Sequence, residues 1–214
     1  MIKENNMSEL TKVLIVDDHE SIRNSLEQEF CSENGFKVIG SIASAADAEV
    51  FCFKYNPSLL ITDVCTERDA SGLETASKIR VKYPEIKIIV TSGFNEVTYV
   101  PRAKELGANA FVYKTKSLAY FREVAIRILN GETVFPEPKS IPLPRGETPF
   151  TEREMEVLRL MCRGFTGERI AKELFINPGT VKYHKSNMLA KTGFSKAVDL
   201  AFYVISNGWI NPNY

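Results

Sequence analysis

Charged and hydroxyl side chains follow four short apolar runs in the first half of the chain. Asp17 and Asp18 come after the first run, Asp63 after a second, Ser92 after a third and Lys114 after a fourth. If these runs are parallel strands of one open sheet, their carboxyl ends share an edge, where such sheets bind ligands. Three carboxylates, a hydroxyl and an ammonium group would then meet at one place.

Three neighbouring carboxylates repel one another and require a cation. Mg²⁺ suits them because it takes oxygen ligands, few of them carboxylates, and keeps positions that phosphoryl oxygens can occupy. A carboxylate can attack a phosphoryl donor and hold the group as an acyl phosphate, and Asp63 is best placed to do so while Asp17 and Asp18 hold the metal. Lys114 would neutralise phosphoryl charge, and the Ser92 hydroxyl would turn toward a phosphoryl oxygen.

The elements that must position these groups alternate regularly. The runs are continuously apolar, which is typical of strands buried on both faces of a parallel sheet. Stretches between them have helical character, with Gly and Pro at the joins. The pattern predicts an α/β domain with a doubly wound five-stranded parallel sheet over residues 12–130. The predicted strands are 13–16, 36–39, 59–62, 86–91 and 110–113, and the predicted helices are 21–33, 45–55, 73–83, 101–106 and 118–129.

The rest of the chain has a different organisation. Residues 1–11 are polar and predict a flexible lead, in which Met7 is an alternative start, and residues 131–149 contain five prolines and predict an extended linker. Residues 150–214 are helical throughout and predict a second, smaller all-α domain. Its helices are expected at 152–162, 167–174, 178–191 and 195–207.

Two helix starts in this second domain are well marked. Thr151 followed by Glu154 is a capping-box pattern, and Asn177 followed by Pro178 is an N-cap with proline at the first helical position. The sharp start at Asn177 after a short turn predicts the second element of a helix-turn-helix, which places its N-terminal part in the major groove of DNA. We expect DNA contacts from the exposed side chains of Thr180, Lys182, Tyr183, Lys185 and Ser186, while Val181, His184, Met188 and Leu189 face inward.

Composition favours a cytoplasmic protein. No apolar stretch is long enough to span a bilayer, and the N-terminus lacks the apolar run of a signal peptide. The four cysteines are scattered and predict reduced thiols. The net charge is zero, but residues 1–150 hold 18 basic and 21 acidic residues (−3), whereas residues 151–214 hold 9 and 6 (+3). The sign of this offset suits an acidic site followed by a module that binds a polyanion and no membrane.

The motifs of the first domain resemble the flavodoxin-like receiver domain of two-component response regulators. They are Val16-Asp17-Asp18-His19, Ile61-Thr62-Asp63-Val64, Thr91-Ser92-Gly93 and Phe111-Val112-Tyr113-Lys114. The resemblance implies that Asp63 is the phosphoacceptor, that Asp17, Asp18 and the main-chain carbonyl of Cys65 complete the Mg²⁺ ligands with it, and that Lys114 is the site lysine. Ser92 would be the switch hydroxyl and Phe111 the switch aromatic; His19 is interpreted as structural. It further implies no enzymatic turnover beyond phosphotransfer to Asp63 and slow self-dephosphorylation.

Residues 150–210 resemble the LuxR-type helix-turn-helix DNA-binding domain. The motifs are Thr151-Glu152-Arg153-Glu154, Glu168-Arg169-Ile170-Ala171 and Thr180-Val181-Lys182-Tyr183-His184. A receiver joined to this domain is similar to the NarL/FixJ family. The resemblance implies a transcription regulator that is phosphorylated by a sensor histidine kinase, dimerises partly through its last helix and binds an inverted repeat in promoter DNA. RNA polymerase would be a further partner.

Two features depart from the receiver pattern and leave alternatives open. The segment 65–72 has no proline and one residue more than usual, and Pro101 predicts a late or shortened fourth helix. One alternative is therefore a pseudo-receiver that acts as an interaction module, with DNA binding independent of phosphate. The other is a Mg²⁺-dependent phosphohydrolase, but such enzymes typically carry a second Asp two residues after the nucleophile, where this chain has Cys65.

Overall fold

The computed structural model describes residues 10–137, 141 and 150–212. These residues fall into two compact units, one with residues 10–93 and 99–137 and the other with residues 94–98 and the described residues from 141 onward. Most of the predicted lead and linker lies outside the described residues. Thr11, the last residue of that lead, already begins the first strand.

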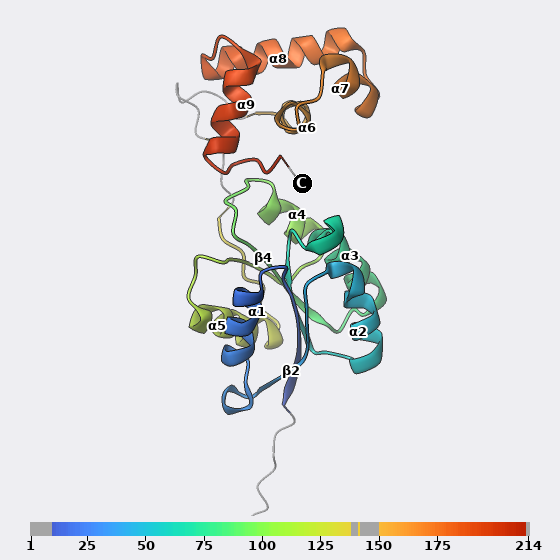
Figure 1. Cartoon of the computed structure of the whole chain (residues 1–214), viewed down its shortest axis with the longest axis vertical. Helices are drawn as coiled ribbons and strands as arrows, with labels where there is room; N and C mark the ends of the chain where they lie inside the picture. The colour runs from blue at the N-terminus through green and yellow to red at the C-terminus, as the bar shows by residue number, and fades with distance from the viewer. Residues whose placement is uncertain (1–9, 138–140, 142–149, 213–214) are drawn as a thin grey trace, which may run out of the picture. The chain divides into compact units, whose positions relative to one another are not determined.

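The first unit is built on a five-stranded parallel sheet (Figure 1). The strand order is β2-β1-β3-β4-β5, so the predicted doubly wound fold is confirmed. From β1 the chain adds β2 on one side and then β3, β4 and β5 on the other. The strand order therefore reverses between β1 and β3, and folds of this kind bind ligands at such a point. The strands are β1 Thr11–Val16, β2 Phe36–Ile42, β3 Leu59–Asp63, β4 Lys87–Ser92 and β5 Ala110–Tyr113.

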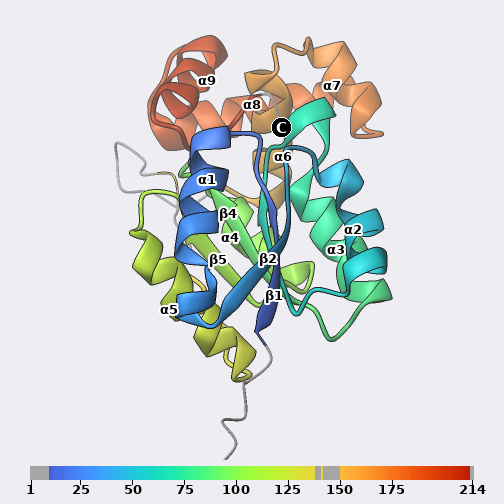
Figure 2. The same ribbon diagram turned by 60° about the horizontal axis from the view of Figure 1, so that its bottom comes forward.

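Five helices cover the two faces of this sheet. Figure 2 shows α1 and α5 on one face and α2 and α3 on the other, and α4 packs beside α3. The helices are α1 Glu20–Glu29, α2 Ala48–Tyr55, α3 Gly72–Lys82, α4 Tyr99–Glu105 and α5 Leu118–Leu129. Three short 3-10 turns join them, η1 Ser32–Asn34, η2 Ala45–Asp47 and η3 Glu67–Asp69.

The central strands are buried on both faces, as their continuous apolar runs predict. The side chains of β1 from Val13 to Val16 have no exposed surface, and those on one face pack against α1 and α5. Burying a side chain of this size stabilises the fold by roughly 1.5–3 kcal/mol. The apolar strands therefore hold the polar groups at their carboxyl ends in place.

Some predicted helix boundaries are wrong. The helix predicted over 21–33 ends at Glu29, because Cys31 is extended, with ψ of 173°, and the separate turn η1 follows it. The helix predicted over 45–55 begins as the turn η2, where the Ser44 hydroxyl accepts a hydrogen bond from the amide of Ala46. Helix α4 is short, as predicted, but it begins before Pro101, whose missing N–H costs nothing in a first turn.

In its described residues, the second unit has four helices around its own apolar core. They are α6 Glu152–Cys162, α7 Gly167–Glu173, α8 Pro178–Thr192 and α9 Ala197–Ser206. Val157, Leu158, Ile170, Met188 and Leu200 lie at the centre of this core. Helix α9 begins two residues later than predicted.

The predicted helix starts of this unit are confirmed. Thr151 and Glu154 form the full capping box at the start of α6, and Asn177 accepts a hydrogen bond from the amide of Gly179 at the start of α8. The Glu154 carboxylate also pairs with Lys191 near the end of α8, at 2.6 Å. Burial raises the pKa of Glu154, but this ion pair and the bonds to Thr151 hold it below its usual value.

The four cysteines are free thiols. Burial raises the pKa of Cys52 to about 11 and that of Cys162 to about 12, so both are neutral packing residues at ordinary pH. Among the described residues, no helix has the length and apolar character needed to cross a bilayer.

Gly72, the first residue of α3, lies directly against the backbone of Asp63. A Cβ atom there would overlap the Asp63 carbonyl oxygen and approach Thr62 Oγ1 to 2.8 Å. The Gly72 amide donates to the Val64 carbonyl at 2.9 Å, which holds α3 against the end of β3. Only glycine fits this contact, because the backbone atoms of Asp63 cannot give way.

We predict that Gly72→Ala destabilises the first unit by about 2 kcal/mol or more, the range found for overpacked sites. Calorimetry of the full chain would measure the loss. Gly167→Ala is the matched control, since nothing lies within 4 Å of a Cβ at Gly167. Equal unfolding temperatures for the two variants would contradict the prediction.

Candidate functional site

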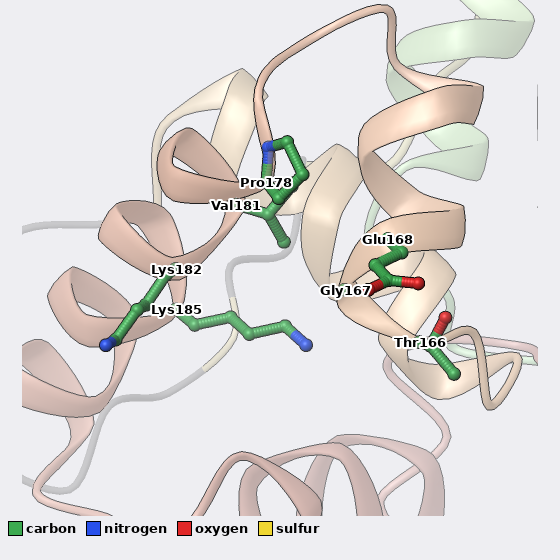
Figure 3. Close-up of a pocket in the computed structure, with 7 residues that line it drawn as sticks. All are labelled: Thr166, Gly167, Glu168, Pro178, Val181, Lys182 and Lys185. Carbon is green, nitrogen blue, oxygen red and sulfur yellow. The ribbon is translucent and has the colours of Figure 1, made fainter.

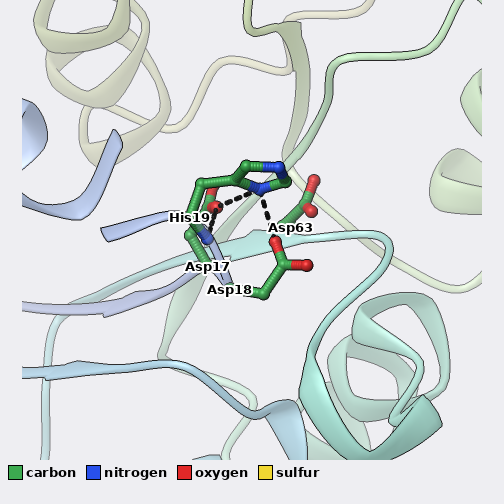
Figure 4. Close-up of side chains that lie close together, drawn as sticks. All are labelled: Asp17, Asp18, His19 and Asp63. Atoms are coloured by element: carbon green, nitrogen blue, oxygen red, sulfur yellow. Dashed lines mark hydrogen bonds and ion pairs between the residues drawn. The ribbon is translucent and has the colours of Figure 1, made fainter. Parts of the chain in front are cut away.

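The predicted acidic cluster is formed at the carboxyl edge of the sheet. Asp17 and Asp18 follow β1, and Asp63 ends β3 (Figure 4). One side-chain ligand atom from each of these residues and from His19 lies within 4.8 Å of all the others. The parallel pairing of β1 with β3 produces this convergence, since Val16 is paired with Thr62 and the next residue of each strand is an aspartate.

Lys114 lies between two of the carboxylates. Its Nζ is 2.7 Å from Asp17 Oδ2 and 3.1 Å from Asp63 Oδ2, and all three side chains are almost entirely buried. Burial lowers the pKa of Lys114, but the charge of Asp63 and the hydrogen bond to Asp17 raise it above the usual value. Lys114 is therefore a fixed cation within an acidic cluster.

Asp63 has a strongly perturbed acidity. Burial raises its pKa to about 7; Lys114 opposes this rise and the Asp17 charge adds to it. The protein alone thus does not fully stabilise the charged form of this carboxylate at neutral pH. A divalent cation would supply the missing stabilisation by favouring the ionised form.

The donor set fits a hard divalent cation. Asp17 Oδ2 and Asp18 Oδ1 are buried, and among the described residues their close charged contacts are with Lys114 Nζ at 2.7 Å and with His19 Nδ1 at 2.6 Å. Oxygen atoms in this state are available as ligands for Mg²⁺, which prefers carboxylate oxygen and water. The arrangement is compatible with divalent-metal binding.

The other predicted site residues lie around this cluster. Ser92 ends β4 and Phe111 lies in β5; both are buried, and Phe111 contacts the Tyr113 ring edge-to-face at 5.1 Å. Cys65 begins the loop after Asp63, and its Sγ is 3.7 Å from Tyr99 Oη. The switch roles of Ser92 and Phe111, and the carbonyl of Cys65 as a ligand, stay predictions.

The unusual loop after Asp63 is anchored to the turn η2. Thr66 Oγ1 accepts from the Ala45 amide at 2.9 Å and donates to the Ala70 carbonyl at 2.6 Å, and the Ser44 hydroxyl donates to the Glu67 carbonyl. Arg68 takes up the extra length in the left-handed region, with φ of 61°. The loop is thus fixed by buried and partly buried hydrogen bonds despite lacking proline.

Two further groups hold the acidic cluster, and sequence reasoning missed one of them, Arg23. Arg23 of α1 donates from Nη1 to the carbonyls of Asp17 at 2.7 Å and Asp18 at 3.1 Å. His19, expected to be structural, has its Nδ1 2.6 Å from Asp18 Oδ1. The sequence contains no motif that would identify Arg23, because the atoms it contacts are main-chain carbonyls, which every residue has.

The predicted DNA-contacting residues all lie on α8, but the predicted exposure of two of them is wrong. Lys182, Tyr183 and Ser186 are exposed as expected, whereas Thr180 and Lys185 are half-buried rather than exposed. Their partial burial follows from packing of α8 against α7 and α6. Of the predicted inward residues, Val181 and Met188 are buried, and His184 and Leu189 are half-buried.

A hollow of about 570 Å³ lies between the start of α7 and helix α8. Thr166, Gly167 and Glu168 line one side, and Pro178, Val181, Lys182 and Lys185 line the other (Figure 3). The two lysines extend from α8, the second helix of the helix-turn-helix. This surface thus combines a concave shape with cationic side chains.

Two family models match the chain. Residues 13–125 match the response regulator receiver domain, and residues 148–204 match the bacterial regulatory proteins of the luxR family. The chain therefore belongs to the two-component response regulators, and its C-terminal part is a LuxR-type DNA-binding domain. The resemblance expected from the sequence motifs is confirmed.

Relatives cover nearly the whole chain. The response regulator protein VraR of Staphylococcus epidermidis is 30% identical over 207 residues, which cover 93% of this chain and 98% of VraR, and VraR of Staphylococcus aureus matches equally. Among solved structures, RcsB of Salmonella typhimurium has a TM-score of 0.59 at 22% identity, covering 93% of this chain and 100% of RcsB. The fold is thus that of RcsB-type response regulators.

The pKa of Asp63 predicts a specific dependence of stability on pH. In the unfolded chain Asp63 ionises near pH 3.9, whereas in the fold it ionises near pH 7. The unfolded state therefore releases this proton first, and the wild-type chain loses stability relative to Asp63→Asn as pH rises from about 4 to about 7. Calorimetry in EDTA should show the difference growing to a few kcal/mol and then staying constant. A difference independent of pH would contradict the prediction.

Proposed function

We propose that this response regulator is a transcription factor whose DNA binding is controlled by Mg²⁺-dependent phosphorylation of Asp63. The observation that carries the proposal is the cluster of Asp17, Asp18, Asp63 and Lys114 in a chain that continues into a helix-turn-helix. Neither half alone would support a switch. Together they supply a site for a charge change and a module that responds to it.

The chemical step is phosphoryl transfer to a side-chain oxygen. An Asp63 oxygen attacks the phosphorus atom of the donor, the bond from phosphorus to the donor's leaving group breaks, and that group departs with the bonding electron pair. Lys114, 3.1 Å from Asp63 Oδ2, supports the product by neutralising part of the phosphoryl charge. A sensor histidine kinase is the expected donor, and the chain itself performs only this transfer and slow hydrolysis of its own acyl phosphate.

Mg²⁺ would be held by the carboxylates of Asp17, Asp18 and Asp63, with the Cys65 carbonyl as the predicted further ligand. When bound, it supplies charge that stabilises the ionised Asp63 and the transferring phosphoryl oxygens. Lys114 Nζ lies 2.7 Å from Asp17 Oδ2 and 3.1 Å from Asp63 Oδ2, and so it orients both carboxylates. Arg23 holds the main chain of both metal aspartates.

DNA binding would use the start of α8. Lys182 and Tyr183 are exposed near its N-terminus, and Lys185 borders the adjoining hollow. RcsB structures of the same fold include complexes with DNA, at a TM-score of 0.63. Val198 and Phe202 expose apolar surface on α9, and this supports dimerisation through that helix on an inverted repeat.

The pseudo-receiver remains a second candidate because of the loop after Asp63. Its anchoring through Thr66 and Ser44 fixes a route past the site that differs from the usual proline-containing loop. In that case the first unit would bind a partner without being phosphorylated. The two candidates differ in whether Asp63 accepts a phosphoryl group.

Incubation with acetyl phosphate and Mg²⁺ tests this difference. We expect intact mass spectrometry to show an adduct of about 80 Da, the mass of a phosphoryl group, on the wild-type chain. Asp63→Ala should show none, and EDTA should abolish the wild-type adduct. An unmodified wild-type chain would favour the pseudo-receiver, and steady turnover of free phosphate esters would favour a phosphohydrolase.

Gel shifts on the chain's own promoter region test control of DNA binding. Phosphorylated wild type should bind at least about tenfold more tightly than unphosphorylated protein, the size of a typical coupling energy, with half-sites about one helical turn apart. Asp63→Ala is the control and should bind at the unphosphorylated level under both conditions. If all forms bound equally, DNA binding would stand but phosphate control would not.

A further inference from the structure

Two arginines share one aromatic ring between α6 and α7. Arg169 Cζ is 3.6 Å from the centroid of the Phe165 ring, and Arg163 Cζ is 5.0 Å from it. Both arginines are exposed, whereas Phe165 is half-buried against the apolar core of the second unit. The ring is therefore a fixed platform for two cationic side chains.

The charges of this cluster are incompletely balanced. Arg169 has one distant ion pair, Nε to Glu173 Oε1 at 3.9 Å, between two exposed side chains, and such pairs contribute little. Within the described part of the chain, no carboxylate lies at ion-pair distance from Arg163. Two guanidinium groups held near one ring repel each other, so an anion that bridges them would be stabilised.

The geometry favours a phosphate as this anion. A guanidinium group that lies over an aromatic ring keeps the N–H donors at its edge, and these match two phosphate oxygens at once. The ring limits the rotamers of the arginines before an anion binds, which lowers the entropy lost on binding. Arg163 and Arg169 thus differ from the flexible lysines of α8.

The position of the cluster links it to the DNA-binding surface. Phe165 directly precedes Thr166, Gly167 and Glu168, which form the α7 side of the hollow opposite Lys182 and Lys185. The first helix of a helix-turn-helix crosses the DNA backbone while the second enters the groove. Because the Glu168 carboxylate disfavours a phosphate over the α7 side of the hollow, the nearby guanidinium groups are its better partners.

We propose that Arg163, Phe165 and Arg169 form a second site for DNA backbone phosphate, separate from the contacts of α8. The inference rests on the proposed DNA binding and adds a sequence-independent contact to it, since phosphate contacts position a protein without reading bases. The stacked arginines would fix the start of α7 on one strand while Lys182 and Tyr183 meet the groove.

The test is the salt dependence of binding by the full chain. Fluorescence anisotropy with duplexes of unrelated sequence, from 50 to 200 mM KCl, would compare wild type with the double variant Arg163→Gln, Arg169→Gln. Each lost phosphate contact lowers the slope of log affinity against log salt concentration by about 0.9. We expect a slope lower by about 2 and an affinity reduced about fivefold or more, equally on every duplex.

Matched variants separate this site from general charge and from folding. Lys54→Gln, Lys78→Gln removes two positive charges from exposed lysines of α2 and α3 and should leave the slope unchanged. Phe165→Leu keeps both arginines and apolar bulk, so it should retain the slope but weaken binding at least about twofold by freeing the arginines. Unchanged affinity in Phe165→Leu would overturn the role of the ring.

An unaltered salt-dependence slope in the arginine double variant would overturn the phosphate site, and so would a loss of affinity confined to one DNA sequence. In either case, DNA binding by the wild-type chain would leave the proposed function intact. Absence of DNA binding by the wild-type chain, phosphorylated or not, would instead overturn both. Equal unfolding temperatures of all variants would show that each change acts at the surface.

Discussion

The pairing of Lys114 with Asp17 and Asp63 is the interaction on which the site depends. Three carboxylates at the end of two adjacent strands would repel one another, and one buried ammonium group compensates only part of their charge. Burial raises the pKa of Asp63, and the charge of Asp17 adds to this rise. The uncompensated charge of the carboxylates would favour binding of a divalent cation at this edge of the sheet.

The fold and the members of the acidic cluster could be predicted because they depend on local, repetitive patterns. Continuous apolar runs identify buried parallel strands, and the residue after each run must lie at the carboxyl edge. The same reasoning could not reveal the role of Arg23, because its partners are main-chain carbonyls. It also could not show that position 72 requires glycine, because that requirement comes from contact with the Asp63 backbone. Contacts of this kind depend on how α1 and α3 pack, which no short motif encodes.

In the second unit, capping patterns predicted the helix starts correctly, whereas the exposure of side chains on α8 was predicted only in part. Thr151 with Glu154, and Asn177 with Pro178, act through hydrogen bonds within a few residues, so their spacing is sufficient. The partial burial of Thr180 and Lys185 depends instead on how α8 packs against its neighbours. The cluster of Arg163 and Arg169 on Phe165 also requires a turn between two helices, and spacing alone did not indicate it.

The Glu154 carboxylate completes the capping box at the start of α6 and pairs with Lys191 at the end of α8. One side chain thereby joins the start of α6 to the end of α8. For protein engineering, this sets the boundary of the module: a chimaera that fuses it to another sensor must retain Thr151 and Lys191 together. Over evolutionary time, positions 151, 154 and 191 should change as a set when the unit is exchanged between proteins.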